Sequence, residues 1–100
     1  MTPLERDIEK KLRLMVEHHG GLCLKWVCPG WSGVPDRLIL LPGGHVIFAE
    51  TKRPKGGTLD RLQIWWRERL QNLGFWSVVV WDMENIKTLE LVILDLMGRR

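Results

Sequence analysis

Two apolar runs joined by a Pro-Gly-Gly turn constrain the fold of this chain more than any other feature. Residues 38–41 and 46–49 are entirely apolar, and Pro42-Gly43-Gly44 stands between them. Clusters of Pro and Gly mark tight turns, and short apolar runs are typical of buried strands. The pattern predicts a β-hairpin with strands over 36–41 and 45–52, which are central strands of a sheet and are covered on both faces.

The rest of the chain supplies helices and further strands around this hairpin. The expected segments are helices over 4–18 and 59–73, strands over 22–27 and 75–81, and a helix, or a short helix and a strand at 89–94, over 83–97. Thr2 with Pro3 and Thr58 are the expected N-terminal caps of the two helices. The order α-β-β-β-α-β predicts a single α/β domain with a mixed central sheet flanked by helices.

Length and composition indicate a globular domain with a mildly basic surface. The chain has 100 residues, 45% hydrophobic and 27% charged, with a formal net charge of +3. This charge permits nucleic acid as a partner without requiring it. Cys23 and Cys28 are not expected to form a disulfide or a zinc site. No signal peptide and no membrane-spanning run is recognisable, so we expect a cytoplasmic protein with no membrane partner.

Two carboxylates and a lysine fall at the open end of the hairpin. Glu50 and Lys52 share one face of a strand, and counting back from the turn places Asp36 opposite Glu50. Facing residues lie about 5 Å apart, so the two carboxylates would repel unless a cation lay between them. The alternative is a surface Asp in a turn and an ordinary Glu–Lys pair at a strand end.

The first helix offers a third acid. In helical projection Glu5 falls within the apolar stripe of Leu4, Ile8, Leu12 and Met15, and Glu9 falls at its margin. An acid on a buried face needs a partner, which a metal at the sheet would supply. Equally, Glu5 could serve only to cap the helix N-terminus.

The second helix places a polar residue at the edge of its apolar stripe. The stripe consists of Leu59, Leu62, Trp66, Leu70 and Leu73. Gln63 projects at its edge, where its amide can face the sheet or remain an ordinary boundary residue. Ile64 and Trp65 project away from the stripe, which predicts a second covered surface.

Together these residues resemble the PD-(D/E)xK nuclease superfamily, and within it the VRR-NUC (virus-type replication-repair nuclease) domain. The matching pieces, spread over residues 4–82, are Glu5 with Ile8, Gly33-Val34-Pro35-Asp36, Glu50-Thr51-Lys52, and Gln63 with Trp66. Each piece alone is weakly specific, whereas the ordered set is fairly specific.

The resemblance implies a divalent-metal-dependent DNA endonuclease. Glu5, Asp36, Glu50 and the Thr51 carbonyl would then bind Mg²⁺, with Mn²⁺ as a possible substitute. Lys52 would orient the attacking water or stabilise charge on the phosphate, and Gln63 would support the site by hydrogen bonding. Stand-alone members resemble Holliday junction resolvases, which implies a homodimer, four-way junction DNA as substrate and a phage or prophage origin.

Basic residues cluster near the expected site. We expect DNA contacts from Lys25, Trp31, Arg37, Arg53, Lys55 and Arg61. Such contacts would be salt-dependent and largely independent of sequence. Ile64, Trp65 and the Val-rich strand over 75–81 are the expected dimer surface.

Three alternatives stay open at the sequence level. The first is a nuclease for flaps or other branched or duplex DNA, the second a non-catalytic DNA-binding module of the same fold, and the third a protein-interaction domain with Trp-rich surfaces. The preferred DNA structure, the number of metal ions and any sequence preference are not encoded in a recognisable motif.

Overall fold

The expected element order is present, and the final segment is a helix throughout. The computed structural model describes residues 4–98. The elements are α1 (Glu5–His18), β1 (Leu22–Lys25), β2 (Arg37–Leu41), β3 (His45–Thr51), α2 (Arg61–Asn72), β4 (Trp76–Val80) and α3 (Met83–Leu96). The expected cap Thr2 and its neighbour Pro3 lie outside the described residues. The α1 helix starts at Glu5, where the Asp7 carboxylate accepts the Leu4 N–H at 2.9 Å.

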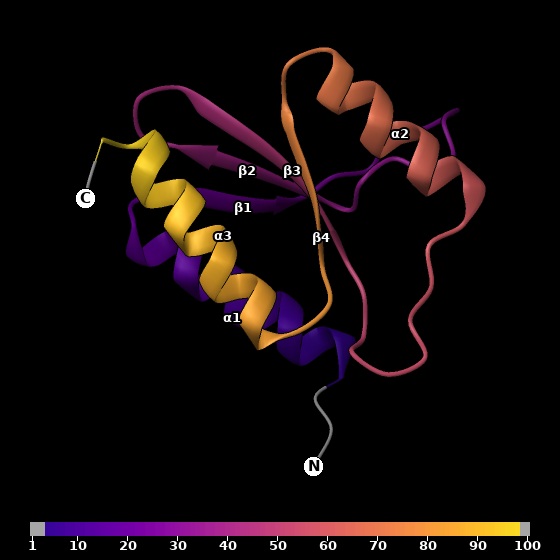
Figure 1. Cartoon of the computed structure of the whole chain (residues 1–100), viewed down its shortest axis with the longest axis horizontal. Helices are drawn as coiled ribbons and strands as arrows, with labels where there is room; N and C mark the ends of the chain where they lie inside the picture. Colours follow the sequence, from indigo (N-terminus) through magenta and orange to yellow (C-terminus); the bar gives the residue numbers. More distant parts are fainter. Residues whose placement is uncertain (1–3, 99–100) are drawn as a thin grey trace.

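The four strands form one mixed sheet in the order β1-β2-β3-β4 (Figure 1). The strands β1, β2 and β3 run antiparallel, and α2 then crosses over so that β4 pairs parallel with β3. The predicted hairpin is confirmed, with Arg37 opposite Ala49 and Leu41 opposite His45. This register fixes which residues meet at the open end of the hairpin.

The helices α1 and α3 lie side by side on one face of the sheet (Figure 1). The largest fully buried side chains of the core are Ile8, Leu12, Ile39, Ile47 and Ile93, each at 0% exposure. The spacing of Ile8 and Leu12 explains the packing of α1, because residues four apart share a helix face. Leu4, predicted to join this stripe, is half-exposed.

The second face of the sheet is covered only in part. The single helix α2 packs on β4, and the Phe48 ring packs against Trp26 and Phe75, at centroid distances of 5.1 and 5.4 Å. Leu22 and Leu24 on β1 remain 53% and 43% exposed on this face. The predicted coverage of the central strands therefore holds for β3, and the exposed part of this face is the edge strand β1, which α2 does not reach.

Two predictions about α2 are wrong. The N-cap is Asp60 rather than Thr58: the Asp60 carboxylate accepts the Gln63 N–H at 2.9 Å, and the Gln63 side chain accepts the Asp60 N–H at 3.0 Å. Of the predicted apolar stripe only Leu70 is buried, whereas Leu62 and Leu73 are about half-exposed. A helix that covers one strand buries a narrower stripe than periodicity alone predicts.

Both cysteines are free, with Cys23 buried in the core and Cys28 half-buried. None of the three helices in the described part of the chain is long and apolar enough to cross a membrane.

Candidate active site

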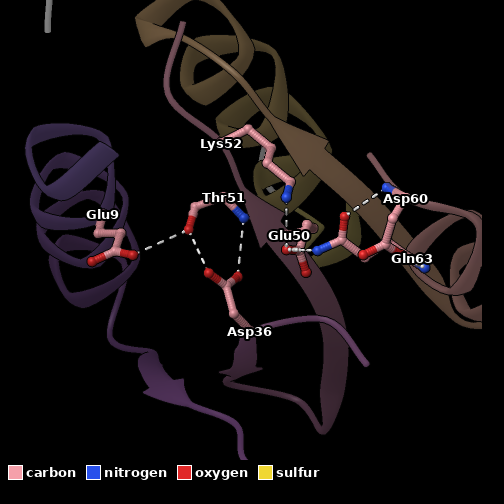
Figure 2. Close-up of polar contacts among 7 residues, drawn as sticks. All are labelled: Glu9, Asp36, Glu50, Thr51, Lys52, Asp60 and Gln63. Carbon is pink, nitrogen blue, oxygen red and sulfur yellow. Dashed lines mark hydrogen bonds and ion pairs between the residues drawn. The ribbon is translucent and has the colours of Figure 1, made fainter. Parts of the chain in front are cut away.

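The site is built where β2 begins and β3 ends, at the open end of the hairpin. Asp36 precedes β2, and its carboxylate accepts two hydrogen bonds from Thr51: the backbone N–H at 3.0 Å and the hydroxyl at 2.6 Å (Figure 2). Thr51 is fully buried, so its position is fixed by the sheet. The Asp36 side chain is thereby held against β3 in one orientation.

Two acids of α1 lie beside Asp36. One carboxylate oxygen from each of Glu5, Glu9 and Asp36 falls within 4.8 Å of the others, and all three residues are half-buried. Glu9 also reaches Thr51, with 3.3 Å between its Oε1 and the Thr51 hydroxyl (Figure 2). Its other oxygen, Oε2, pairs with Arg37 Nη2 at 2.9 Å. Three carboxylates this close repel one another unless positive charge is supplied.

Glu50 occupies the other side of Asp36. Its Oε1 accepts a hydrogen bond from Gln63 Nε2 at 2.8 Å and lies 3.7 Å from Lys52 Nζ (Figure 2). Its Oε2 is buried and has no hydrogen-bond partner among the described residues. Burial, and then the neighbouring charge of Asp36, raise the pKa of Glu50 to about 7, against the opposing effect of Lys52. Glu50 is therefore a carboxylate short of positive charge.

The site straddles β3. Consecutive side chains of a strand point to opposite faces: Thr51 meets Glu9 from α1, whereas Glu50 meets Gln63 from α2 (Figure 2). Asp36 is hydrogen-bonded to Thr51 directly. It precedes Arg37, which pairs with Ala49, so Asp36 lies opposite Glu50, as counting back from the turn predicts. Asp36 is thus shared by two groups of acids, one with Glu5 and Glu9 of α1 and the other with Glu50.

These residues fit a hard divalent cation. The buried Oε2 of Glu50 lacks a partner and the oxygens of Glu5, Glu9 and Asp36 converge, and carboxylate oxygens are the ligands that Mg²⁺ and Mn²⁺ prefer. The convergent set differs from the predicted Glu5, Asp36 and Glu50, because Glu9 belongs to it and Glu50 does not. Glu9 lies one turn after Glu5 on the same helix face, a spacing that points to both acids together.

The loop before Asp36 is fastened to α2. Gly33 has a φ of +84°, and a Cβ placed there would lie 2.4 Å from Leu62 Cβ. One residue earlier, the Ser32 carbonyl accepts a hydrogen bond from Trp66 Nε1 at 2.9 Å. Only glycine permits both this backbone conformation and this close approach. The contact couples the position of Asp36 to that of the helix carrying Gln63.

The predicted DNA-contacting residues divide into two groups. Arg37 is largely buried and paired with Glu9, so it belongs to the acidic cluster itself. The others are exposed: Lys25 at the end of β1, Trp31 in the following loop, Arg53 and Lys55 after β3, and Arg61 at the start of α2. The Trp31 ring, 62% exposed, lies 5.7 Å from the Trp66 ring. Sequence reasoning did not single out Arg6, Lys10 and Arg13, which line a pocket with Arg37.

Comparison with known proteins places this arrangement in a class. The chain is 41% identical over 85 residues to a phage protein named "Putative nuclease p44" (Acyrthosiphon pisum secondary endosymbiont phage 1), a match that covers 85% of this chain and 89% of that protein. A solved structure described as a VRR_NUC domain matches with a TM-score of 0.80 and 32% identity, over 85% of this chain and 91% of the other. A scan against protein-family models found no match.

The fold, with its four-stranded mixed sheet and flanking helices, is that of a nuclease of the PD-(D/E)xK type, as the sequence predicted. Within that class the chain belongs to the VRR-NUC family.

Proposed function

We propose that this VRR-NUC protein is a divalent-metal-dependent DNA endonuclease that uses Mg²⁺, with Mn²⁺ as a substitute. One observation carries the proposal: Asp36 lies between two groups of carboxylates, with Lys52 beside them. Glu5 and Glu9 converge on Asp36 from α1, and Glu50 lies on the other side with an unpartnered buried oxygen. Arg37 and Lys52 offset part of this negative charge, a bound cation would offset more of it, and phosphate hydrolysis is chemistry that a cation in this setting assists.

Each side chain then has a role in the hydrolysis. Glu5, Asp36, Glu50 and the Thr51 carbonyl would hold the cation, with Glu9 able to join them. A cation held there would supply Lewis-acid polarisation of the phosphate and a lowered pKa of water. Lys52, whose side chain is 17% exposed, lies 3.7 Å from Glu50 and would orient the attacking water or stabilise charge on the phosphate.

Two side chains hold the acids in place. Thr51 fixes Asp36 through two hydrogen bonds, and Gln63 fixes one oxygen of Glu50. Gln63 is itself anchored by the reciprocal hydrogen bonds with Asp60 at the start of α2. Anchored ligands lose little freedom when substrate arrives, which favours the reacting geometry.

The proposed substrate is branched DNA, with the four-way junction first among the candidates. Exposed basic residues lie on both sides of the acids, with Lys25 on β1 and Arg53, Lys55 and Arg61 after β3. Trp31 presents an exposed ring on which an unstacked base or a sugar can pack. A junction offers such bases where its strands exchange, and the loop that carries Trp31 leads directly to Asp36.

A homodimer completes the proposal. A four-way junction has approximate twofold symmetry, and a symmetric dimer presents two equivalent sites to it. Ile64 and Trp65 are 38% and 50% exposed on α2, and Trp76 is 46% exposed on the edge strand β4, which supports these residues as part of a dimer surface, whereas Val80 is buried. Light scattering at micromolar concentration should give twice the chain mass, and a monomer that cuts junctions symmetrically contradicts the dimer.

The decisive experiment compares cleavage of a four-way junction, a flap and a linear duplex with Mg²⁺ and with EDTA. We expect metal-dependent cleavage, fastest on the junction, and loss of cleavage in Lys52→Ala. Lys87→Ala on α3, which removes the same charge away from the acids, should cut like the wild type. If Lys52→Ala also cuts like the wild type, the proposed role of Lys52 is wrong. If the flap is cut faster than the junction, the substrate is flap DNA and not the four-way junction.

A further inference from the structure

A basic pocket adjoins the acidic cluster on the outer side of α1. It has a volume of about 270 Å³ and is lined by Arg6, Glu9, Lys10, Arg13 and Arg37. Four of these five residues are cationic, and the one acid, Glu9, also belongs to the acidic cluster. The pocket and the candidate active site therefore share a wall.

The helical repeat explains why the cations gather here. Arg6, Lys10 and Arg13 follow one another at spacings of four and three residues, so their side chains project from one face of α1. Arg37, at the start of β2, closes the pocket from the sheet side. Lys25 pairs with Arg37 in the sheet register and is exposed on the edge strand β1, which extends the positive surface past the pocket.

The positive charges in the pocket are only partly balanced by protein groups. In the described part of the chain Arg6 and Lys10 make no ion pair, and Arg13 pairs only with the exposed Glu17, at 3.1 Å. Arg37 donates to Glu9, but its Nε is buried and finds no acceptor among residues 4–98. A guanidinium short of acceptors favours an oxyanion, and phosphate fits a cluster of guanidinium and ammonium groups well.

We propose that this pocket binds a backbone phosphate of the DNA next to the phosphate that is cut. The inference rests on the proposed DNA nuclease function and names a contact beyond it. Because Glu9 forms the wall between pocket and acids, a strand whose phosphate occupies the pocket is held with its neighbouring phosphate beside the Glu5–Glu9–Asp36 group. The pocket thus fixes the register of the cut strand without reading its sequence.

The test removes two charges from the pocket and compares them with two charges removed elsewhere. The pocket variant is Lys10→Gln with Arg13→Gln. The matched control is Lys11→Gln with Lys87→Gln, whose side chains line a separate groove between α1 and α3. Binding of a fluorescent four-way junction is measured by anisotropy in EDTA over a series of salt concentrations, so the readout does not require cleavage.

We expect the pocket variant to bind about tenfold more weakly at physiological salt and to lower the slope of log K against log salt by about 1 to 2, as for one or two lost phosphate contacts. The control should stay within about twofold of the wild type. Equal weakening in both variants, or none in the pocket variant, overturns the subsite. A wild type that binds in EDTA but never cuts with Mg²⁺ instead overturns the proposed catalysis and leaves the binding comparison valid.

Discussion

Asp36 and Thr51 are joined by two hydrogen bonds, one to the backbone N–H of Thr51 and one to its hydroxyl. The hydroxyl contact, at 2.6 Å, is the shorter, and it joins the fully buried Thr51 to the half-buried Asp36. Because Thr51 orients the Asp36 carboxylate, a substitution of Thr51 tests whether that orientation matters to the reaction.

Thr51→Val keeps the shape of the side chain and removes the hydroxyl. We expect unfolding free energy to fall by about 1–3 kcal/mol, because the Asp36 carboxylate loses a buried donor. Cleavage should fall by about tenfold or more while DNA binding in EDTA changes little. Thr88→Val is the control, because the Thr88 hydroxyl donates to the Glu84 carbonyl on the exposed side of α3. Equal cleavage by Thr51→Val and the wild type would show that the backbone contact alone positions Asp36.

Asp36→Asn removes the charge shared by the two groups of acids and keeps the size of the side chain. We expect cleavage to be abolished under conditions where the wild type cuts, because a neutral amide is a poor ligand for a hard cation. DNA binding in EDTA should persist, since removing negative charge does not weaken phosphate contacts. Asp95→Asn, exposed on α3, is the matched control. Loss of binding in Asp36→Asn alone would mean that Asp36 shapes the DNA surface instead.

The stability of the metal-free protein should depend on the ionisation of Glu50. The pKa of Glu50 is raised from 4.5 to about 7 by burial and by Asp36, so the folded protein holds this proton more tightly than the unfolded chain does. Stability from the protonated form is therefore fully present below about pH 4.5 and is lost as the pH rises through about 7. The expected loss is about 2–3 kcal/mol.

Denaturant unfolding in EDTA at several pH values measures this effect. Glu50→Gln, which cannot ionise, should remove most of the decline between pH 4.5 and 7, and Mg²⁺ added to the wild type should flatten it because the cation stabilises the charged form. If Glu50→Gln and the wild type lose the same stability over this range, groups other than Glu50 cause the pH dependence of the stability.

Gly33→Ala should damage both the fold and the activity. The added Cβ would lie 2.4 Å from Leu62 Cβ, at a backbone φ of +84°. Gly30→Ala is a close control, because Gly30 has a φ of +86° but nothing within 4 Å of the added carbon. We expect Gly30→Ala to cost about 1 kcal/mol for the backbone strain alone. Gly33→Ala should cost about 1–3 kcal/mol more and reduce cleavage, because the clash displaces the loop that leads to Asp36.

The hairpin and the facing of Asp36 and Glu50 follow from the sequence because a short turn fixes the register of both strands. The contact between Gln63 and Glu50 is harder to predict from the sequence, because it depends on the N-cap of α2. The sequence predicts Thr58 as that cap, whereas the actual cap, Asp60, anchors Gln63. Reciprocal Asp–Gln spacing at 60 and 63 is the local signal that identifies this cap.

The features of the site that the sequence does not predict depend on how the helices pack on the sheet. Glu9 lies at the margin of the apolar stripe of α1, and only the rotation of the packed helix turns it toward Thr51 and Arg37. The pocket with Arg6 and Lys10 likewise arises where α1 crosses the start of β2, which no local pattern encodes. The narrow buried stripe of α2 reflects the single strand that it mainly packs against.

Glu50 and Thr51 are neighbours on opposite faces of β3, so the geometry of the site depends on the register of β3 against β2. A shift of β3 by one residue against β2 would exchange their faces, sending the acid toward α1 and the hydroxyl toward α2. Every acid would still be present in the sequence, yet Gln63 and Asp36 would each lose the partner that they hold. The Pro42-Gly43-Gly44 turn, at the opposite end of the hairpin, is therefore as much a determinant of the active centre as the carboxylates themselves.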